Sequence, residues 1–183
     1  MPGVIRTRVG YAGGEKSNPT YHNLGNHTET IQIDYGPERV NYAELLDIFW
    51  RSHDPTNQPY ARQYMSIVFF HDQEQEKLAE QTKAAIEEQT GRTVLTELRP
   101  AAAFHRAEDY HQKYSLRRHR DLLGELTAAY PDAADLTDST AAARINGFLA
   151  GEGKAATLQS EIDSYGLSQK ARDKLLALVP RLD

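Results

Sequence analysis

The 183-residue sequence contains no cysteine. The chain therefore has no disulfide, no thiolate metal site and no cysteine nucleophile of its own. It also has no apolar run near the ~20 residues that a membrane helix needs, and its first residues lack the pattern of a signal or transit peptide. Together these absences predict a cytoplasmic protein that does not associate with a membrane.

The sequence also lacks a large excess of charge of either sign. Its 26 acidic and 21 basic residues give a net charge of −5. This balance provides no general electrostatic attraction to nucleic acid, which we therefore do not expect as a partner. Hydrophobic residues make up 39% of the chain, and the length suits one globular domain with a small appendage.

Strand and helix patterns alternate over the first hundred residues. The sequence predicts strands at 4–9, 28–35, 64–70 and 93–98, and helices at 41–52 and 72–89. Helical patterns alone follow, at 111–129, 139–150, 155–163 and 168–178. The order β, β, α, β, α, β predicts an α+β fold with helices on one side of a sheet.

The strand at 28–35 has one apolar face that contains a carboxylate. Ile31, Ile33 and Tyr35 alternate with polar residues, and Glu29 occupies the first position of the same face. Such a local inconsistency is expected at functional sites. We therefore expect Glu29 to be at least partly buried, among apolar neighbours that favour a protonated carboxyl group.

Two further patterns argue against phosphate and metal sites. The glycine-rich segment at 10–17 resembles a phosphate-binding loop, but Glu15 occupies the glycine position before Lys16 and would repel phosphate. A turn after a strand is the better interpretation. The seven histidines show no zinc-binding spacing, so we expect no metal.

Tyrosine is abundant, with ten residues, and four tyrosines lie in or beside predicted turns: Tyr11, Tyr21, Tyr60 and Tyr64. A tyrosine on a loop presents a rigid apolar ring and one hydroxyl group, which suits an apolar ligand with one polar atom. Ordinary surface tyrosines are the alternative interpretation.

Seven short segments, taken in order, resemble the methionine sulfoxide reductase A family. They are Gly3–Gly14, Asn18–Tyr21, Gly25–Thr30, Phe49–Trp50, His53–Thr56, Gln63–Ser66 and Ala107–Tyr114. Each segment is weak alone, but their shared order is specific. We therefore predict a reductase-like domain over residues 1–114 and a helical C-terminal extension over residues 115–183. The resemblance implies a ferredoxin-like two-layer sandwich of a mixed β-sheet with helices.

The resemblance also implies an activity and a set of functional residues. The activity is reduction of the S epimer of methionine sulfoxide in proteins, with thioredoxin as the reductant and with neither a metal nor an organic cofactor. By motif position Glu29 is the acid that protonates the sulfoxide oxygen, and the Tyr21 and Tyr64 hydroxyl groups bind that oxygen. Five further residues are expected to support this group: His27, Asp54, Arg62, Tyr110 and His111.

The sequence departs from the family pattern in two places. The family nucleophile lies in a Gly-Cys-Phe-Trp segment before the Pro-Gly-Val region, and the 183 residues contain no such segment. A family aspartate also has no counterpart in the loop 57–62, where Tyr60 or Arg62 could take its space.

These departures leave three hypotheses open. The chain is a reductase without its N-terminal segment, through a misplaced start or a truncation, or it is a cysteine-free module that binds oxidised methionine, or it is a non-functional remnant. As given, we expect it to be inactive on methionine sulfoxide. We also expect it to be poorly soluble or partly unfolded, because an inner strand of the family's sheet is absent.

Overall fold

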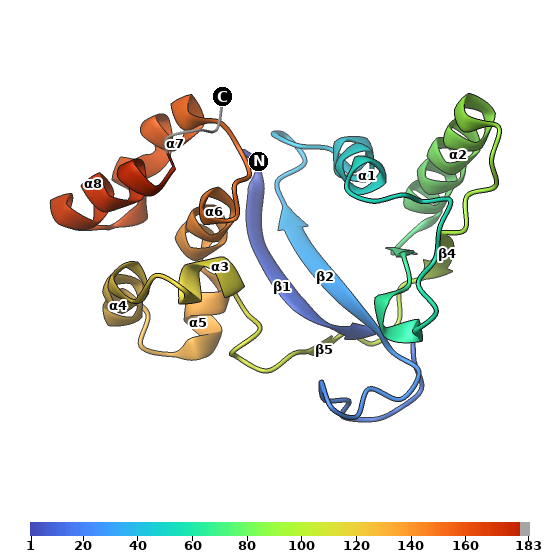
Figure 1. The fold of residues 1–183 in the computed structure, drawn as a ribbon, viewed down its shortest axis with the longest axis horizontal. Helices are drawn as coiled ribbons and strands as arrows, with labels where there is room; N and C mark the ends of the chain where they lie inside the picture. Colours follow the sequence, from blue (N-terminus) through green and yellow to red (C-terminus); the bar gives the residue numbers. More distant parts are fainter. Residues whose placement is uncertain (180–183) are drawn as a thin grey trace. The chain divides into compact units, whose positions relative to one another are not determined.

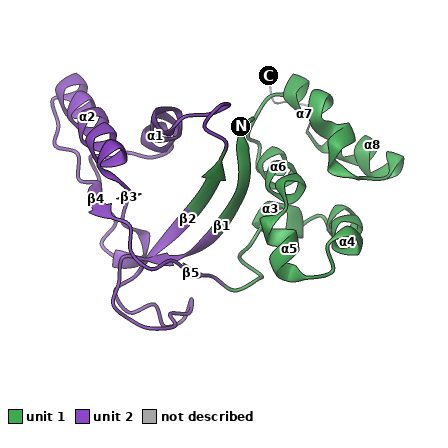
Figure 2. Cartoon of the chain, turned by 180° about the vertical axis from the view of Figure 1, so that it is seen from behind, with its two compact units in different colours: residues 1–8, 32–35, 108–183 green, residues 9–31, 36–107 purple. Residues whose placement is uncertain are grey.

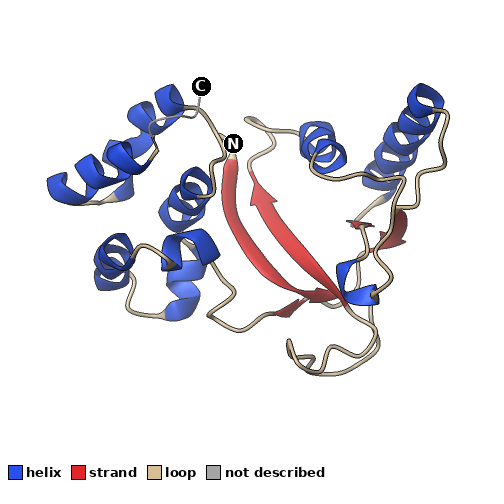
Figure 3. Ribbon diagram, in the orientation of Figure 1, coloured by secondary structure: helices blue, strands red, loops and turns tan. Residues whose placement is uncertain are grey.

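The computed structural model describes residues 1–179. Two short sheets and a series of helices make up the fold (Figures 1 and 3). In the first sheet, β1 (Val4–Ala12) lies between β2 (Thr28–Tyr35) and β5 (His105–Arg106). β1 and β5 are antiparallel, with Tyr11 opposite His105.

The second sheet is a parallel pair. β3 (Ile67–Phe70) and β4 (Glu97–Pro100) are joined through α2 (Gln73–Thr90), the helical crossover that a parallel pair requires. Before them come α1 (Tyr42–Arg51) and the 3₁₀ turn η1 (Arg62–Tyr64). The mixture of parallel and antiparallel strands with helices confirms the predicted α+β class.

The remaining chain is helical, as the sequence predicts. Its elements are α3 (Tyr114–Arg117), α4 (Arg120–Ala129), α5 (Ala133–Asp138), α6 (Thr140–Leu149), α7 (Ala155–Glu161), η2 (Ile162–Tyr165) and α8 (Gln169–Leu178). The single helix predicted over 111–129 is wrong. Lys113 adopts a left-handed backbone conformation (φ 53°) and its ammonium group donates to the Thr7 carbonyl, so the helix begins only after it.

The chain divides into two compact units (Figure 2). Unit 1 contains residues 1–8, 32–35 and 108–183, and unit 2 contains residues 9–31 and 36–107. Strands β1 and β2 therefore supply residues to both units. The predicted boundary at residue 114 stays a prediction, and residues 180–183 of the predicted extension lie outside the described part.

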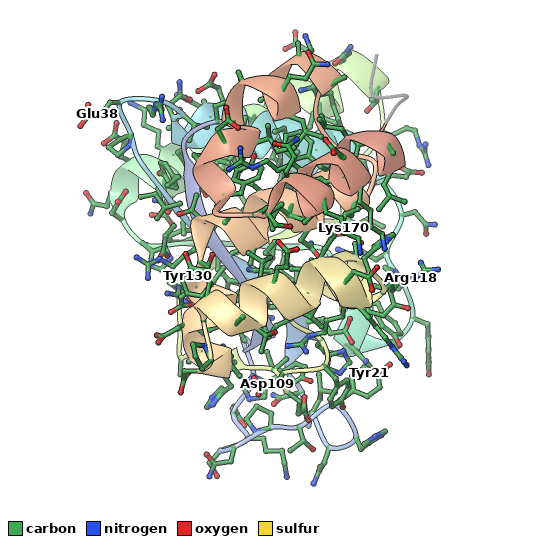
Figure 4. The ribbon with its side chains drawn as sticks, turned by 90° about the vertical axis from the view of Figure 1, so that its left-hand side faces the viewer. Tyr21, Glu38, Asp109, Arg118, Tyr130 and Lys170 are labelled. Carbon is green, nitrogen blue, oxygen red and sulfur yellow. The ribbon has the colours of Figure 1, made fainter. Side chains whose placement is uncertain are left out.

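Unit 1 has an apolar core built mainly from its helices. Its members with 0% exposure are Leu116, Leu122, Ala142, Ile145 and Leu175. Figure 4 shows the side chains of this helical region, with Tyr130 after α4 and Lys170 in α8 labelled.

Polar contacts join the strand segments of unit 1 to its helices. Arg8 donates to both carboxylate oxygens of Asp138 in α5, at 2.7 and 3.1 Å, and to Asp34 of β2 at 3.2 Å. A paired contact of this kind fixes direction as well as distance. Arg8 of β1 thus links α5 and β2 within one compact unit.

Unit 2 has two smaller buried clusters. Leu46 and Trp50 of α1 pack with Val68 of β3 and Ala79 of α2, and Tyr11 packs with Leu24 and Ala107. Asn41 caps α1: its side chain accepts from the Glu44 amide at 2.9 Å, and Glu44 accepts from the Asn41 amide. This is the capping box that the sequence predicts.

Two predicted strand boundaries in unit 2 are wrong. Tyr64 belongs to η1 and β3 begins at Ile67, while β4 begins at Glu97 and not at 93. The amide of Val94 donates to the Glu87 side chain and that of Leu95 donates to the Pro55 carbonyl. These backbone groups are therefore bonded outside the β3–β4 pair.

Candidate functional site

The site begins at the first two residues of β2, which point to opposite sides of the strand. Thr28 is buried, and its hydroxyl group donates to the Arg62 carbonyl at 3.0 Å. Glu29 is exposed. The expectation that Glu29 is partly buried is therefore wrong. Because the strand turns its threonine face inward, burial does not supply the desolvation that the sequence argument assumed.

The next residue on the same face of β2 is also exposed, against the prediction from the sequence pattern. Ile31 is 56% exposed although it lies on the apolar face of the sequence pattern. On the opposite face, Gln32 and Asp34 accept hydrogen bonds from Arg8, at 3.1 and 3.2 Å. A charged partner on β1 thus gives the polar face of β2 its contacts.

The turn η1 places two side chains beside Glu29. Its backbone closes through the Tyr64 amide, which donates to the Ala61 carbonyl at 3.0 Å. Gln63, in the middle of the turn, donates from Nε2 to Oε1 of Glu29 at 2.7 Å. The next residue, Tyr64, is 54% exposed. One short turn therefore carries both a contact to the carboxylate and a phenol.

Tyr21 completes the group from the loop between β1 and β2, where Figure 4 labels it. Interaction with Tyr21, through charge and through a hydrogen bond between the two side chains, raises the pKa of Tyr64 above its ordinary value. The nearby charge of Glu29 acts in the same direction. The structure thus brings Tyr21, Glu29 and Tyr64 together.

His27 holds the loop that carries Tyr21. Its ring is 1% exposed, Nδ1 accepts from the Gly14 amide at 3.2 Å, and Nε2 lies 2.9 Å from the Lys16 carbonyl. This pattern requires the neutral ring with its proton on Nε2. A side chain at Gly14 would approach the His27 amide to 2.6 Å, so glycine is required there. Both ring nitrogens are used in backbone contacts, which makes His27 a support of the loop.

Arg62 supports the site from the other side of η1. It donates to Glu97 of β4 at 2.5 Å and to the Met65 sulfur at 3.4 Å. Burial raises the pKa of Glu97, but Arg62 and Arg99 outweigh it and hold the pKa below its usual range. The ion pair therefore anchors η1 to the second sheet while Thr28 anchors it to the first.

The other predicted support residues have different contacts. Asp54 is exposed and accepts from both the amide and the hydroxyl group of Thr56, which lower its pKa. Tyr110 and His111 belong to unit 1, where their rings lie 4.2 Å apart. A functional role for these three residues stays a prediction.

Gln63 is the contact that the sequence reasoning missed. It stands in the Gln63–Ser66 segment that carries part of the family resemblance, but no role was predicted for it. Its position beside Tyr64 was the available signal. Its partner could not be read from the sequence, because 34 residues separate it from Glu29.

Two carboxylate oxygens and two phenol hydroxyl groups meet at this exposed point. Such a group can donate several hydrogen bonds to one acceptor oxygen of a ligand, and a carboxyl group can pass it a proton. Within residues 1–179, no three histidine, aspartate or glutamate side chains are grouped to hold a metal ion. In the same range no helix has the length and apolar character needed to cross a membrane.

Comparisons with known proteins point in one direction. A family model described as peptide methionine sulfoxide reductase matches residues 1–138. The peptide methionine sulfoxide reductase of Drosophila melanogaster is 41% identical over 174 residues, which cover 93% of this chain and 69% of the fly protein. The peptide methionine sulfoxide reductase A5 of Oryza sativa subsp. japonica is 41% identical over 156 residues, 82% of this chain and 61% of that relative.

Solved structures agree with these relatives. Mxr1 from Saccharomyces cerevisiae in its reduced form superposes with a TM-score of 0.59 at 29% identity, over 64% of this chain and 73% of the yeast chain. Methionine sulfoxide reductase A of Corynebacterium diphtheriae gives 0.55 at 31% identity, over 66% of each chain. The chain thus spans about two thirds of the length of several proteins that it resembles.

Proposed function

Because this chain belongs to the peptide methionine sulfoxide reductase family, we propose that Tyr21, Tyr64 and Glu29 bind the oxygen of methionine sulfoxide. The observation that carries the proposal is the hydrogen-bonded pair of phenols beside a carboxyl group held by Gln63. A sulfoxide is a strong hydrogen-bond acceptor on an otherwise apolar side chain, so it matches two rigid phenols that each carry one hydroxyl group.

The chemistry assigns one step to each group. A thiolate sulfur forms a bond to the sulfoxide sulfur while the carboxyl group of Glu29 gives its proton to the sulfoxide oxygen. The sulfur–oxygen bond of the substrate then breaks and the protonated oxygen leaves as hydroxide. Hydroxide bonds to the attacking sulfur, and the sulfur–sulfur bond breaks with its electron pair on the methionine sulfur, which leaves the attacking sulfur as a sulfenic acid. Methionine is the other product, so the thiol sulfur is oxidised as the sulfoxide sulfur is reduced.

The 183 residues hold the proton donor and the oxygen-binding groups but no thiol. We therefore place the nucleophile outside these residues and expect the chain alone to bind oxidised methionine without reducing it. Thioredoxin as reductant, the S epimer as substrate and a cytoplasmic location stay predictions from the sequence. A sulfenic acid is resolved by a second thiol, which is the chemistry that thioredoxin supplies.

The binding half of the proposal is tested with two peptides that differ only in one oxygen atom. A short peptide with methionine (S)-sulfoxide and its unoxidised form are titrated into the ¹⁵N-labelled chain. We expect the oxidised peptide to bind more tightly and to shift the Tyr21 and Tyr64 amide signals. The peptide with the (R)-sulfoxide is the matched control. Equal affinity for all three peptides would contradict the proposal.

The reductase form of the proposal differs from a pure binding module in one measurable way. A Gly-Cys-Phe-Trp-bearing segment is fused in frame before Met1, and reduction of the peptide with dithiothreitol is followed by mass spectrometry. We expect reduction by the fused chain, and none by the chain alone or by a fusion with serine in place of cysteine. A fused chain that binds the sulfoxide but never reduces it would support the binding module instead.

A further inference from the structure

Gln63 has one side-chain contact that bears directly on the proposed chemistry. We propose that Gln63 is a positioning residue that fixes the Glu29 carboxyl group and directs its proton to Oε2. The proposal rests on the proposed function of Glu29. It adds a named residue and a stated oxygen atom to that function.

The contact itself selects the oxygen. Gln63 donates from Nε2 to Oε1 of Glu29 at 2.7 Å. An amide nitrogen can only donate, so Oε1 must accept whether Glu29 is ionised or protonated. In the protonated acid the carbonyl oxygen is the stronger acceptor, so the contact with Gln63 favours Oε1 as the carbonyl oxygen and Oε2 as the oxygen that carries the hydrogen. The proton that the sulfoxide oxygen receives leaves from Oε2.

Packing does not provide this orientation. Glu29 is exposed, so its long side chain would otherwise lose rotamer freedom only when substrate binds. Gln63 is half-buried and lies on a turn of three residues. A hydrogen bond from a fixed donor orders the exposed acid before the substrate arrives, which lowers the cost of binding.

The donor is fixed because the residue before it is held at both ends. The Arg62 carbonyl accepts from the buried Thr28 hydroxyl group at 3.0 Å, and the Arg62 guanidinium group donates to Glu97 at 2.5 Å. Thr28 is also the neighbour of Glu29 on β2. Thr28 therefore fixes the backbone next to both residues. It precedes Glu29 in β2, and it bonds to the carbonyl of Arg62, which precedes Gln63.

The turn also couples the acid to the phenols. Tyr64 follows Gln63 directly, and its side chain is hydrogen-bonded to that of Tyr21. One rigid turn therefore sets the carboxyl group from one residue and the oxygen-binding hydroxyl groups from the next. Without Gln63, the phenols remain in place while the acid alone loses its orientation.

The first experiment reads the carboxyl group directly. Infrared spectra of the acidified chain are recorded for the native sequence and for Gln63→Leu, and the Glu29 carbonyl band is assigned by its absence in Glu29→Gln. Because the carbonyl oxygen loses a hydrogen bond, we expect the band to move to higher frequency in Gln63→Leu. Gln89→Leu, an exposed glutamine at the end of α2, is the matched control and leaves the band unchanged.

The second experiment reads the consequence for the ligand. In Gln63→Leu the affinity for the (S)-sulfoxide peptide falls about three- to tenfold, the range expected for one lost hydrogen bond. Affinity for the unoxidised peptide is unchanged. In a Glu29→Ala background, Gln63→Leu has no further effect, because its action passes through Glu29. Thermal melts show that each variant is folded.

The outcomes separate the two proposals. An unshifted carbonyl band in Gln63→Leu, or an equal loss of sulfoxide affinity in the Glu29→Ala background, overturns the role of Gln63. A shifted band in a chain whose native form binds oxidised and unoxidised peptides equally overturns the proposed function instead. A shifted band together with the affinity loss through Glu29 supports both.

Discussion

The helical core of unit 1 and the candidate site of unit 2 use different kinds of contact. Leu116, Leu122, Ile145 and Leu175 are 0% exposed, and their helices meet through apolar packing. At the site, Tyr64 is 54% exposed, and Gln63 contacts Glu29 through a hydrogen bond. Packing is non-directional and stabilises in proportion to buried area, whereas hydrogen bonds set direction at little net gain in stability.

The difference explains how the site can be both open and ordered. A side chain that must meet a ligand cannot be fixed by burial, so hydrogen bonds from better-buried neighbours fix it. The half-buried Gln63 does this for Glu29. Thr28 and His27, which are 2% and 1% exposed, hold the backbone segments that carry the site residues. Substitutions in the core should therefore lower the free energy of unfolding. Substitutions at the site should change the orientation of its side chains and have little effect on stability.

The largest expected effect is a core deletion. Ile145→Ala removes a fully buried side chain from α6. We expect a loss of about 4 kcal/mol in the free energy of unfolding, from lost apolar burial and the remaining cavity. Urea denaturation followed by circular dichroism measures it. Ile145→Val is the control, at a cost of about 1 kcal/mol. Equal losses in the free energy of unfolding for the two variants would contradict the view that apolar packing stabilises this core.

A smaller effect is expected at the ion pair in the same unit. Arg144, 8% exposed in its side chain, donates to both Glu161 oxygens, and the Tyr165 hydroxyl group donates to Glu161 as well. Burial raises the pKa of Glu161, but Tyr165 and Arg144 outweigh it, so the pKa lies below its ordinary value of 4.5. Glu161→Gln leaves a buried arginine without its counter-charge and should cost about 3 kcal/mol at neutral pH.

The sign of the pH dependence follows from the lowered pKa. The contribution of Glu161 to stability is complete above pH 4.5 and is lost as the pH falls through its value in the folded chain. The difference in the free energy of unfolding between Glu161→Gln and the native chain should therefore become smaller as the pH is lowered. Asp163→Asn breaks an exposed pair with Arg172 and is the control, at less than about 0.5 kcal/mol. A difference that grows as the pH is lowered would contradict the prediction that ionised Glu161 stabilises the fold.

The smallest effect on stability is expected at the phenol pair. Tyr21→Phe removes the hydroxyl group that raises the pKa of Tyr64, so that pKa should fall back toward its ordinary value of 10.0. Titration of tyrosinate absorbance, with Tyr64→Phe to identify the signal, measures the shift. Tyr60→Phe changes a fully exposed phenol and should leave the Tyr64 pKa as it is. A Tyr64 pKa that is unchanged in Tyr21→Phe would show that the phenols do not interact.

The order of strands and helices as far as β4, the α+β class and several local signals were predictable from the sequence, whereas β5 and α5 were not predicted. The cap of α1 by Asn41 and the end of α2 at Gly91, with its left-handed backbone, both follow the expected chemistry. These features depend on residues within one turn of each other. Local propensity is sufficient for them because no distant partner takes part.

The segments of the site were also found from the sequence, through the resemblance of short motifs taken in order. Tyr21 and Tyr64 lie on a loop and a turn, as expected, and meet beside Glu29. The exposure of Glu29 and its contact with Gln63 were not predicted. A period of two shows that a strand has two faces, but it does not show which face turns inward.

Tertiary structure made that choice through partners distant in the sequence. Arg8 bonds to Gln32 and Asp34, and Thr28 bonds to the carbonyl of Arg62, 34 residues away. A buried hydroxyl group without a partner costs about 1–3 kcal/mol. Thr28 turns inward where the Arg62 carbonyl accepts its hydrogen bond, and Glu29 and Ile31 on the other face are exposed. The sequence by itself thus determined which segments supply the residues of the candidate site. Long-range hydrogen bonds decided that Glu29 is exposed there and that Gln63 contacts its Oε1.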